Sequence, residues 1–143
     1  PDVLVSESGG IVGMMTDQGR SLSKPRGDGF SATSWLENDG DLSDQTKAHA
    51  RGGFAETGRS REFLIGGRTI LHATGKQASA YAVSRCQEAW LVVVNVRAEG
   101  RRGCLIYDSA KLAESGSLAI TDTENGPQIL TARDVTGKRL WSQ

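Results

Sequence analysis

Short apolar runs, interrupted by glycine-containing turns, make up the first part of the chain. They predict strands over residues 2–6 and 11–16 and a short strand over 21–23, arranged as a meander of β-hairpins. The next apolar positions recur at helical spacing and predict a short helix over about 31–37, which Ser31 could cap. The N-terminal part is therefore expected to be β-rich with one helix.

From residue 62 onward the pattern alternates between strands and helices. Apolar runs over 62–65 and 68–73, separated by Gly66-Gly67, predict a tight hairpin. The elements predicted after it are an Ala-rich helix over 76–86, a Val-rich strand over 89–95, a strand over 104–107, a helix over about 109–115 that Asp108 or Ser109 could cap and that ends at Gly116, and a final hairpin of 117–121 and 128–132. The β-α-β-β-α-β order across 69–121 favours some parallel pairing. The predicted fold class is mixed α/β (α+β), in which hairpins accompany this alternating segment.

Residues 41–61 differ from the rest, because polar and glycine-rich stretches dominate them. They predict a long surface loop with one brief helical turn, which Asp41, Ser43 or Asp44 could cap. A loop of this length in a compact domain is either functional or mobile. The remaining pattern is continuous, so we expect residues 1–143 to form one domain.

The overall charge argues against a dedicated nucleic-acid-binding module. The chain of 143 residues has 17 Lys and Arg side chains and 17 Asp and Glu side chains, so its formal net charge is zero. Such modules usually have a basic excess, because phosphate neutralisation supplies most of their affinity. Local basic clusters remain at Arg59-Ser60-Arg61 and at Arg97 with Arg101 and Arg102. These side chains would be either solvated loop charges or contacts for phosphates.

No apolar run approaches the ~20 residues that a membrane helix requires. The longest, residues 89–94, has the length of a strand. We therefore expect this sequence not to insert into lipid by itself. Residue 1 is Pro rather than Met, which indicates a processed chain or a fragment, so a membrane segment could lie upstream.

The chain contains no complete catalytic motif. Its two histidines are His49, in a polar segment, and His72, inside a predicted strand where a structural role is expected. Asp39 and Asp41, with His49, could hold a divalent cation, although the same carboxylates could instead terminate and cap helices. Gly75-Lys76 opens a predicted helix and could hold an anion at its N-terminus.

The two cysteines, Cys86 and Cys104, lie in no metal-binding motif. They could form a disulfide in an oxidising compartment, or they could be two buried thiols. The residues alone leave both alternatives open.

Several motifs follow one another in a recognisable order. One Cys precedes an apolar strand and a second Cys follows it, at Cys86, 89–94 and Cys104. A segment with spaced Asp, Leu and Gly then leads to a terminal hairpin and a Trp. Its parts are 106–108, Leu112, Gly116, 119–120 and 139–141. Residues 1–5 and 30–41 add to this pattern. In these features the chain resembles the C-terminal end of ComEC-type DNA-internalisation (competence) membrane proteins, and the resemblance covers most of its length.

The resemblance implies a degenerate, truncated metallo-β-lactamase-like domain. In the wider family this region holds two metal ions that activate water for phosphodiester cleavage. Here no H-x-H-x-D-H cluster occurs, Lys76 follows Gly75 where the family has Gly-Asp, and Val96-Arg97 stand where it has His-His-Gly-Ser. The resemblance thus implies a domain without metal, cofactor or catalytic residues.

The family would place this domain at the extracytoplasmic, periplasmic face of an inner-membrane protein. Its expected partners are the rest of the channel polypeptide and, weakly, DNA. The DNA-contact candidates are Lys76, Arg97, Arg101 and Arg102. A disulfide between the two cysteines would fit that compartment.

Two other functions remain open at this stage. The first is a metal-dependent nuclease or hydrolase with an atypical site built from Asp39, Asp41, His49 and His72. The second is a protein-interaction domain unrelated to DNA uptake, in which the 41–61 segment would bind the partner.

Overall fold

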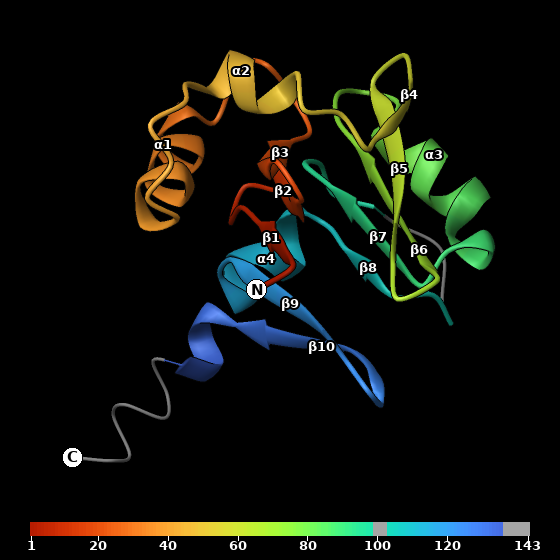
Figure 1. Cartoon of the computed structure of the whole chain (residues 1–143). Helices are drawn as coiled ribbons and strands as arrows, with labels where there is room; N and C mark the ends of the chain where they lie inside the picture. The colour runs from red at the N-terminus through yellow and green to blue at the C-terminus, as the bar shows by residue number, and fades with distance from the viewer. Residues whose placement is uncertain (99–102, 136–143) are drawn as a thin grey trace.

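A computed structural model describes residues 1–98 and 103–135 of the chain. Two five-stranded sheets and five helices make up this part (Figure 1). In chain order the elements are β1 (Val3–Val5), β2 (Val12–Thr16), β3 (Gly19–Leu22), α1 (Gly29–Asn38), α2 (Gln45–His49), β4 (Ala55–Thr57), β5 (Ser60–Ile65), β6 (Arg68–Ala73), α3 (Ala78–Arg85), the 3₁₀ helix η1 (Cys86–Glu88), β7 (Leu91–Val94), β8 (Ile106–Tyr107), α4 (Ser109–Ser115), β9 (Leu118–Thr123) and β10 (Gly126–Thr131). The mixed α+β fold class is confirmed.

The first sheet has the strand order β10-β9-β1-β2-β3, and all of its pairs are antiparallel. The second has the order β4-β5-β6-β7-β8. Its hairpin strands β4, β5 and β6 are antiparallel, whereas β6–β7 and β7–β8 are parallel. The parallel pairing predicted from the β-α-β-β-α-β order is therefore confirmed.

The two sheets pack face to face around the main core. Apolar side chains from both sheets and Leu112 of α4 form this core, which includes Val5, Ile120, Ile70 and Val93. The opposite face of the second sheet packs against α3, and α1 and α2 pack against the other side of the first sheet (Figure 1). Because β7 lies between the core and α3, all four of its side chains are buried, as its continuous apolar pattern predicted.

Turn and cap residues account for several boundaries. Gly66 and Gly67 both have positive φ, which a two-residue β5–β6 hairpin turn requires. The Asp108 carboxylate accepts a hydrogen bond from Lys111 N, and α4 ends at Gly116, as predicted. The start of α1 differs from the prediction. Asp28, rather than Ser31, is its N-cap, and the helix begins at Gly29.

The expectation of a long surface loop over 41–61 requires correction. The segment contains α2, β4 and the beginning of β5. Asp44 caps α2 by accepting a hydrogen bond from Lys47 N, and Ala48 anchors the helix in a small core. Strand β4 is exposed at every position, so it has no apolar alternation that the sequence could reveal.

Among the helices of residues 1–98 and 103–135, none combines the length and apolar character needed to cross a bilayer.

Candidate functional site

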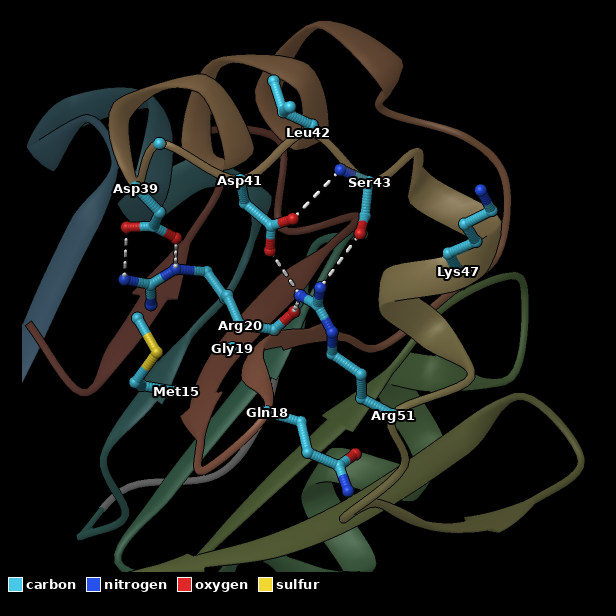
Figure 2. A pocket seen from close by; sticks show the side chains of 11 residues that line it. Met15, Gln18, Gly19, Arg20, Asp39, Asp41, Leu42, Ser43, Lys47 and Arg51 are labelled. Carbon is cyan, nitrogen blue, oxygen red and sulfur yellow. Dashed lines mark hydrogen bonds and ion pairs between the residues drawn. The ribbon is translucent and has the colours of Figure 1, made fainter.

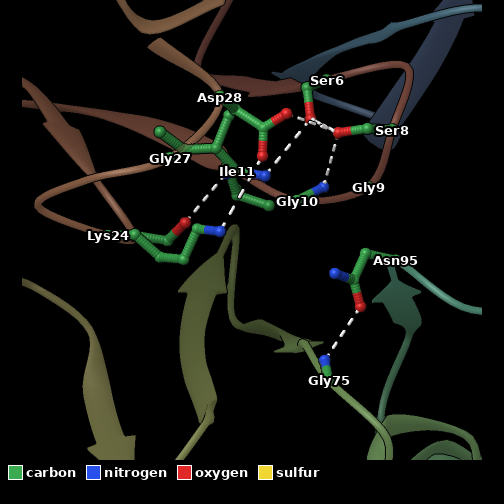
Figure 3. A network of polar contacts seen from close by, with 12 residues as sticks. Ser6, Ser8, Gly9, Gly10, Ile11, Lys24, Gly27, Asp28, Gly75 and Asn95 are labelled. Carbon is green, nitrogen blue, oxygen red and sulfur yellow. Dashed lines mark hydrogen bonds and ion pairs between the residues drawn. The ribbon is translucent and has the colours of Figure 1, made fainter.

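The carboxyl ends of β6 and β7 meet at one edge of the second sheet. The strands are parallel, and Ala73 lies opposite Val94, so the residues that follow each strand arrive at the same place. Gly75 N donates a hydrogen bond to Asn95 Oδ1 at 3.0 Å, which joins the turn before α3 to the segment after β7 (Figure 3). We call residues 74–76 and 95–97 the strand-end edge.

The first sheet closes over this edge through the turn after β1. Gly9 lies so close to the end of β7 that a Cβ atom there would be 2.5 Å from the carbonyl oxygen of Val94, and its φ is +75°. Beside it, Ser8 Oγ donates to Asp28 Oδ1 at 2.8 Å, and Lys24 Nζ lies 3.8 Å from Asp28 Oδ2 (Figure 3). The Asp28 carboxylate is therefore already engaged by neighbouring side chains.

Two of the predicted DNA-contact residues belong to the two segments of the strand-end edge. Lys76 directly follows Gly75 and Arg97 lies two residues after Asn95, and both side chains are exposed. Arg101 and Arg102, the other two candidates, lie outside the described residues. The Gly75–Asn95 hydrogen bond thus joins the two backbone segments that carry these exposed cations, which are 21 positions apart in the chain.

The backbone on both sides of Arg97 is held by the start of α4. Ser109 N donates to Val96 O at 3.1 Å. Ala98 N donates to Asp108 Oδ2 at 2.9 Å, so the α4 cap also holds this segment. Arg97 is therefore an exposed side chain on a backbone fixed by hydrogen bonds.

Arg59 is a third cation at this edge, and the predicted contact set did not include it. It is exposed in the β4–β5 turn, and its Nη1 lies 2.8 Å from where a Cβ on Gly75 would be. Thr74 N donates to Arg59 O at 3.1 Å, which fixes the turn beside β6. The basic cluster around Arg59 and Arg61 was the only sequence signal for it, and its position depends on hairpin pairing.

His72 has the structural role that its place in a strand predicted. It is fully buried on the face of β6 that carries Ile70, and its Nε2 lies 2.8 Å from Gly9 O. A carbonyl oxygen only accepts, so Nε2 carries the proton and donates. Burial lowers the pKa of His72 to about 3, and the nearby positive charges of Arg61 and Lys24 act in the same direction.

This buried histidine predicts a loss of stability in mild acid. Because the pKa of His72 in the folded state lies below its ordinary value of 6.5, the unfolded chain binds the proton first as the pH falls. The stability that neutral His72 contributes to the fold is fully present above pH 6.5 and is lost as the pH falls toward 3. Between pH 7 and pH 5 we expect the free energy of unfolding to fall by about 2 kcal/mol, measured by urea denaturation.

Replacing the histidine supplies the control. His72→Gln should be less stable at pH 7 but should lose most of this pH dependence, whereas His49→Gln, which removes the other histidine, should retain it. A stability of the wild-type chain that does not change between pH 7 and pH 5 would contradict the prediction.

Of the residues considered for a metal, Asp39 and Asp41 line a different pocket, of about 660 Å³, beside β3 and the α1–α2 connection (Figure 2). Asp39 accepts hydrogen bonds from Arg20 Nε at 2.8 Å and from Nη2 at 3.2 Å. Asp41 accepts from Arg51 Nη1 at 2.6 Å and from Ser43 N at 3.0 Å. The hydrogen bond from Arg51 holds the pKa of Asp41 well below its ordinary value.

His49 binds elsewhere. Its Nδ1 lies 2.8 Å from Leu22 O, and its Nε2 lies 3.5 Å from Glu56 Oε1. Across residues 1–98 and 103–135, no three His, Cys, Asp or Glu side chains gather as a metal site would require. Asp39 and Asp41 instead bind arginines that hold the α1–α2 connection to the first sheet.

The structure joins Cys86 and Cys104 through a disulfide, with the sulfur atoms 2.07 Å apart and the Cα atoms 5.8 Å apart. The bridge links η1 to the residues before β8, and β7 lies between them in the chain. Of the two alternatives that the residues left open, the structure has the disulfide.

Comparisons of the chain with protein-family models, with curated proteins and with solved structures give no match.

Proposed function

We propose that this chain is a non-catalytic accessory domain of a ComEC-type DNA-uptake membrane protein, and that it contacts nucleic-acid phosphates at the strand-end edge. The observation that carries the proposal is the Gly75–Asn95 hydrogen bond, which joins the backbone segments that carry the exposed cations Lys76 and Arg97. These are two of the positions at which the resemblance implies that metal-binding residues have been replaced. A phosphodiester that once lay against metal ions would now lie against side-chain cations.

The electrostatics of the edge support a phosphate contact. None of the salt bridges between described residues uses Lys76, Arg97 or Arg59. Their charges therefore face solvent and can attract an anion. With three such cations among the described residues and a net charge of zero, binding should be weak and strongly dependent on salt.

The proposed location is the periplasmic face of an inner-membrane protein, where the domain would adjoin the rest of the channel polypeptide. The disulfide between Cys86 and Cys104 supports an oxidising compartment. The alternative nuclease would require Asp39, Asp41, His49 and His72 to converge. In the structure the two carboxylates bind arginines and His72 is buried between the sheets, so no observation favours that function.

A salt titration of DNA binding tests the proposal. We expect the 143-residue chain to bind a short duplex or single strand at ~50 mM salt and to lose affinity as salt increases. Lys76→Glu combined with Arg97→Glu should weaken binding by at least about tenfold, or about 1.4 kcal/mol. It should also reduce the slope of log affinity against log salt by about two, because two phosphate contacts are lost.

A second charge-reversal pair provides the matched control. Arg68→Glu with Lys47→Glu changes the net charge equally, but Arg68 lies at the opposite end of β6 and Lys47 lies on α2. Both side chains are exposed. Equal losses from the two pairs would show that only net charge matters, and no salt-dependent binding by the unmodified chain would overturn the proposed function.

A further inference from the structure

A groove adjoins the strand-end edge on the α3 side of the second sheet. It has a volume of about 570 Å³ and lies between the β4–β5 turn, the end of β6 and one face of α3. Its side chains include Arg59, Thr74, Gln77 and Tyr81. This volume falls within the range of about 300–1,000 Å³ that is usual for small-molecule sites.

The groove combines an aromatic surface with hydrogen-bonding groups. Tyr81 is half-buried, and the Arg85 guanidinium carbon lies 5.5 Å from the centre of its ring. Arg85 also pairs with Glu62 and Glu88, which holds it in place and engages both carboxylates. Gln77 is exposed at the start of α3, and its amide can both donate and accept hydrogen bonds.

The groove is continuous with the cations of the edge. Arg59 belongs to both, because it lines the groove and its guanidinium lies over Gly75. Thr74 and Gln77 also line the groove, and Lys76 lies between them in the chain. A phosphate on Lys76 would therefore lie at the groove entrance.

We propose that this groove receives one unpaired nucleobase of the nucleic acid whose phosphates contact Lys76 and Arg97; the inference rests on the proposed function. The base would stack against the Tyr81 ring, and its edge would exchange hydrogen bonds with Gln77 and Arg59. A base within a duplex is stacked and paired, so the groove favours a strand whose bases are free.

The test separates bases from phosphates. Two probes of equal length and charge, about twelve nucleotides long to cover a single binding site, are titrated against the 143-residue chain at ~50 mM salt. One is oligothymidine, and the other has the same phosphodiester backbone with abasic sugars. We expect the oligothymidine to bind at least about fivefold more tightly, the lower range of what one base–aromatic stack contributes.

Substitutions then show which residues cause the difference in affinity between the two probes. Tyr81→Leu keeps the apolar bulk but removes the aromatic ring, and it should bring the oligothymidine affinity down to that of the abasic probe. Gln77→Ala, at an exposed position, should reduce the same difference without disturbing the fold. Tyr107→Leu is the matched control, because it removes the other tyrosine of the chain, and it should leave the difference intact.

Each outcome separates the two proposals. Equal binding of both probes by the unmodified chain would overturn the nucleobase groove while leaving the phosphate contacts in place. A base-dependent difference that persists in Gln77→Ala and Tyr81→Leu would also overturn the groove. The absence of binding by either probe would instead overturn the proposed function itself.

Discussion

Asp39→Ala should destabilise the fold by about 3 kcal/mol, measured as the free energy of unfolding in urea. The Asp39 carboxylate binds two nitrogens of Arg20, whose side chain is only 2% exposed. Removing the carboxylate would leave a buried guanidinium without its counter-charge. Breaking a buried ion pair from one side typically costs about 3–5 kcal/mol. Because Asp39 itself is 22% exposed, we expect the lower end of that range.

Arg20 has few other partners that could compensate its buried charge. Its Nη2 donates to Pro1 O at 3.3 Å, and its Nη1 is buried without a hydrogen-bond partner. Glu37→Ala, at an exposed position near the end of α1, is the matched control and should change stability by less than about 0.5 kcal/mol. In the double variant, Arg20→Met should recover part of the loss caused by Asp39→Ala, because it removes the buried charge. A loss below about 1 kcal/mol would show that the pair is effectively solvated.

Reducing the disulfide should destabilise the chain by about 3 kcal/mol. Cys86 and Cys104 are 18 positions apart, and closing a loop of that length lowers the entropy of the unfolded chain by about this amount. The bridge should therefore stabilise the fold without being required for it. Urea unfolding of the same sample with and without reductant measures the difference.

The variant Cys86→Ser/Cys104→Ser provides the control for this measurement. Its stability should resemble that of the reduced chain and should not respond to reductant. Labelling of unfolded chain with a thiol reagent should detect no free thiol before reduction. Two reactive thiols in the oxidised preparation, or a reductant effect that persists in the serine variant, would contradict the prediction.

Much of the local structure followed from the sequence. The Gly66-Gly67 turn between two apolar runs predicted the β5–β6 hairpin, and Asp108 and Gly116 predicted the two ends of α4. Helix α3 was predicted too long, because its first residues form a turn that the Gly75–Asn95 hydrogen bond holds. Such errors arise where a long-range contact outweighs local propensity.

The candidate site was likewise predicted only in part from the sequence. The sequence itself marked Lys76 and Arg97 as cations beside a helix start and a strand end. It could not show that Arg59 would join them, because the position of Arg59 depends on the exposed strand β4 and its pairing with β5. It also suggested Asp39 and Asp41 as metal ligands, since a carboxylate gives no sign of an arginine that folding brings to it from 10 or 19 positions away.

By itself, the sequence determined the hairpins, the main helices, the presence of some parallel pairing within 69–121 and the strand position of His72, because these depend on periodicity, element order and turn chemistry over short distances. The tertiary structure decided which of those elements pair and pack against one another. Strand β1 pairs with β9, more than 100 residues later, and the two sheets then bury one shared core. Local patterns contain no information about such partners, because any strand with one apolar face satisfies the same alternation. The strand-end edge and its groove form only after these strands have paired and the two sheets have packed together.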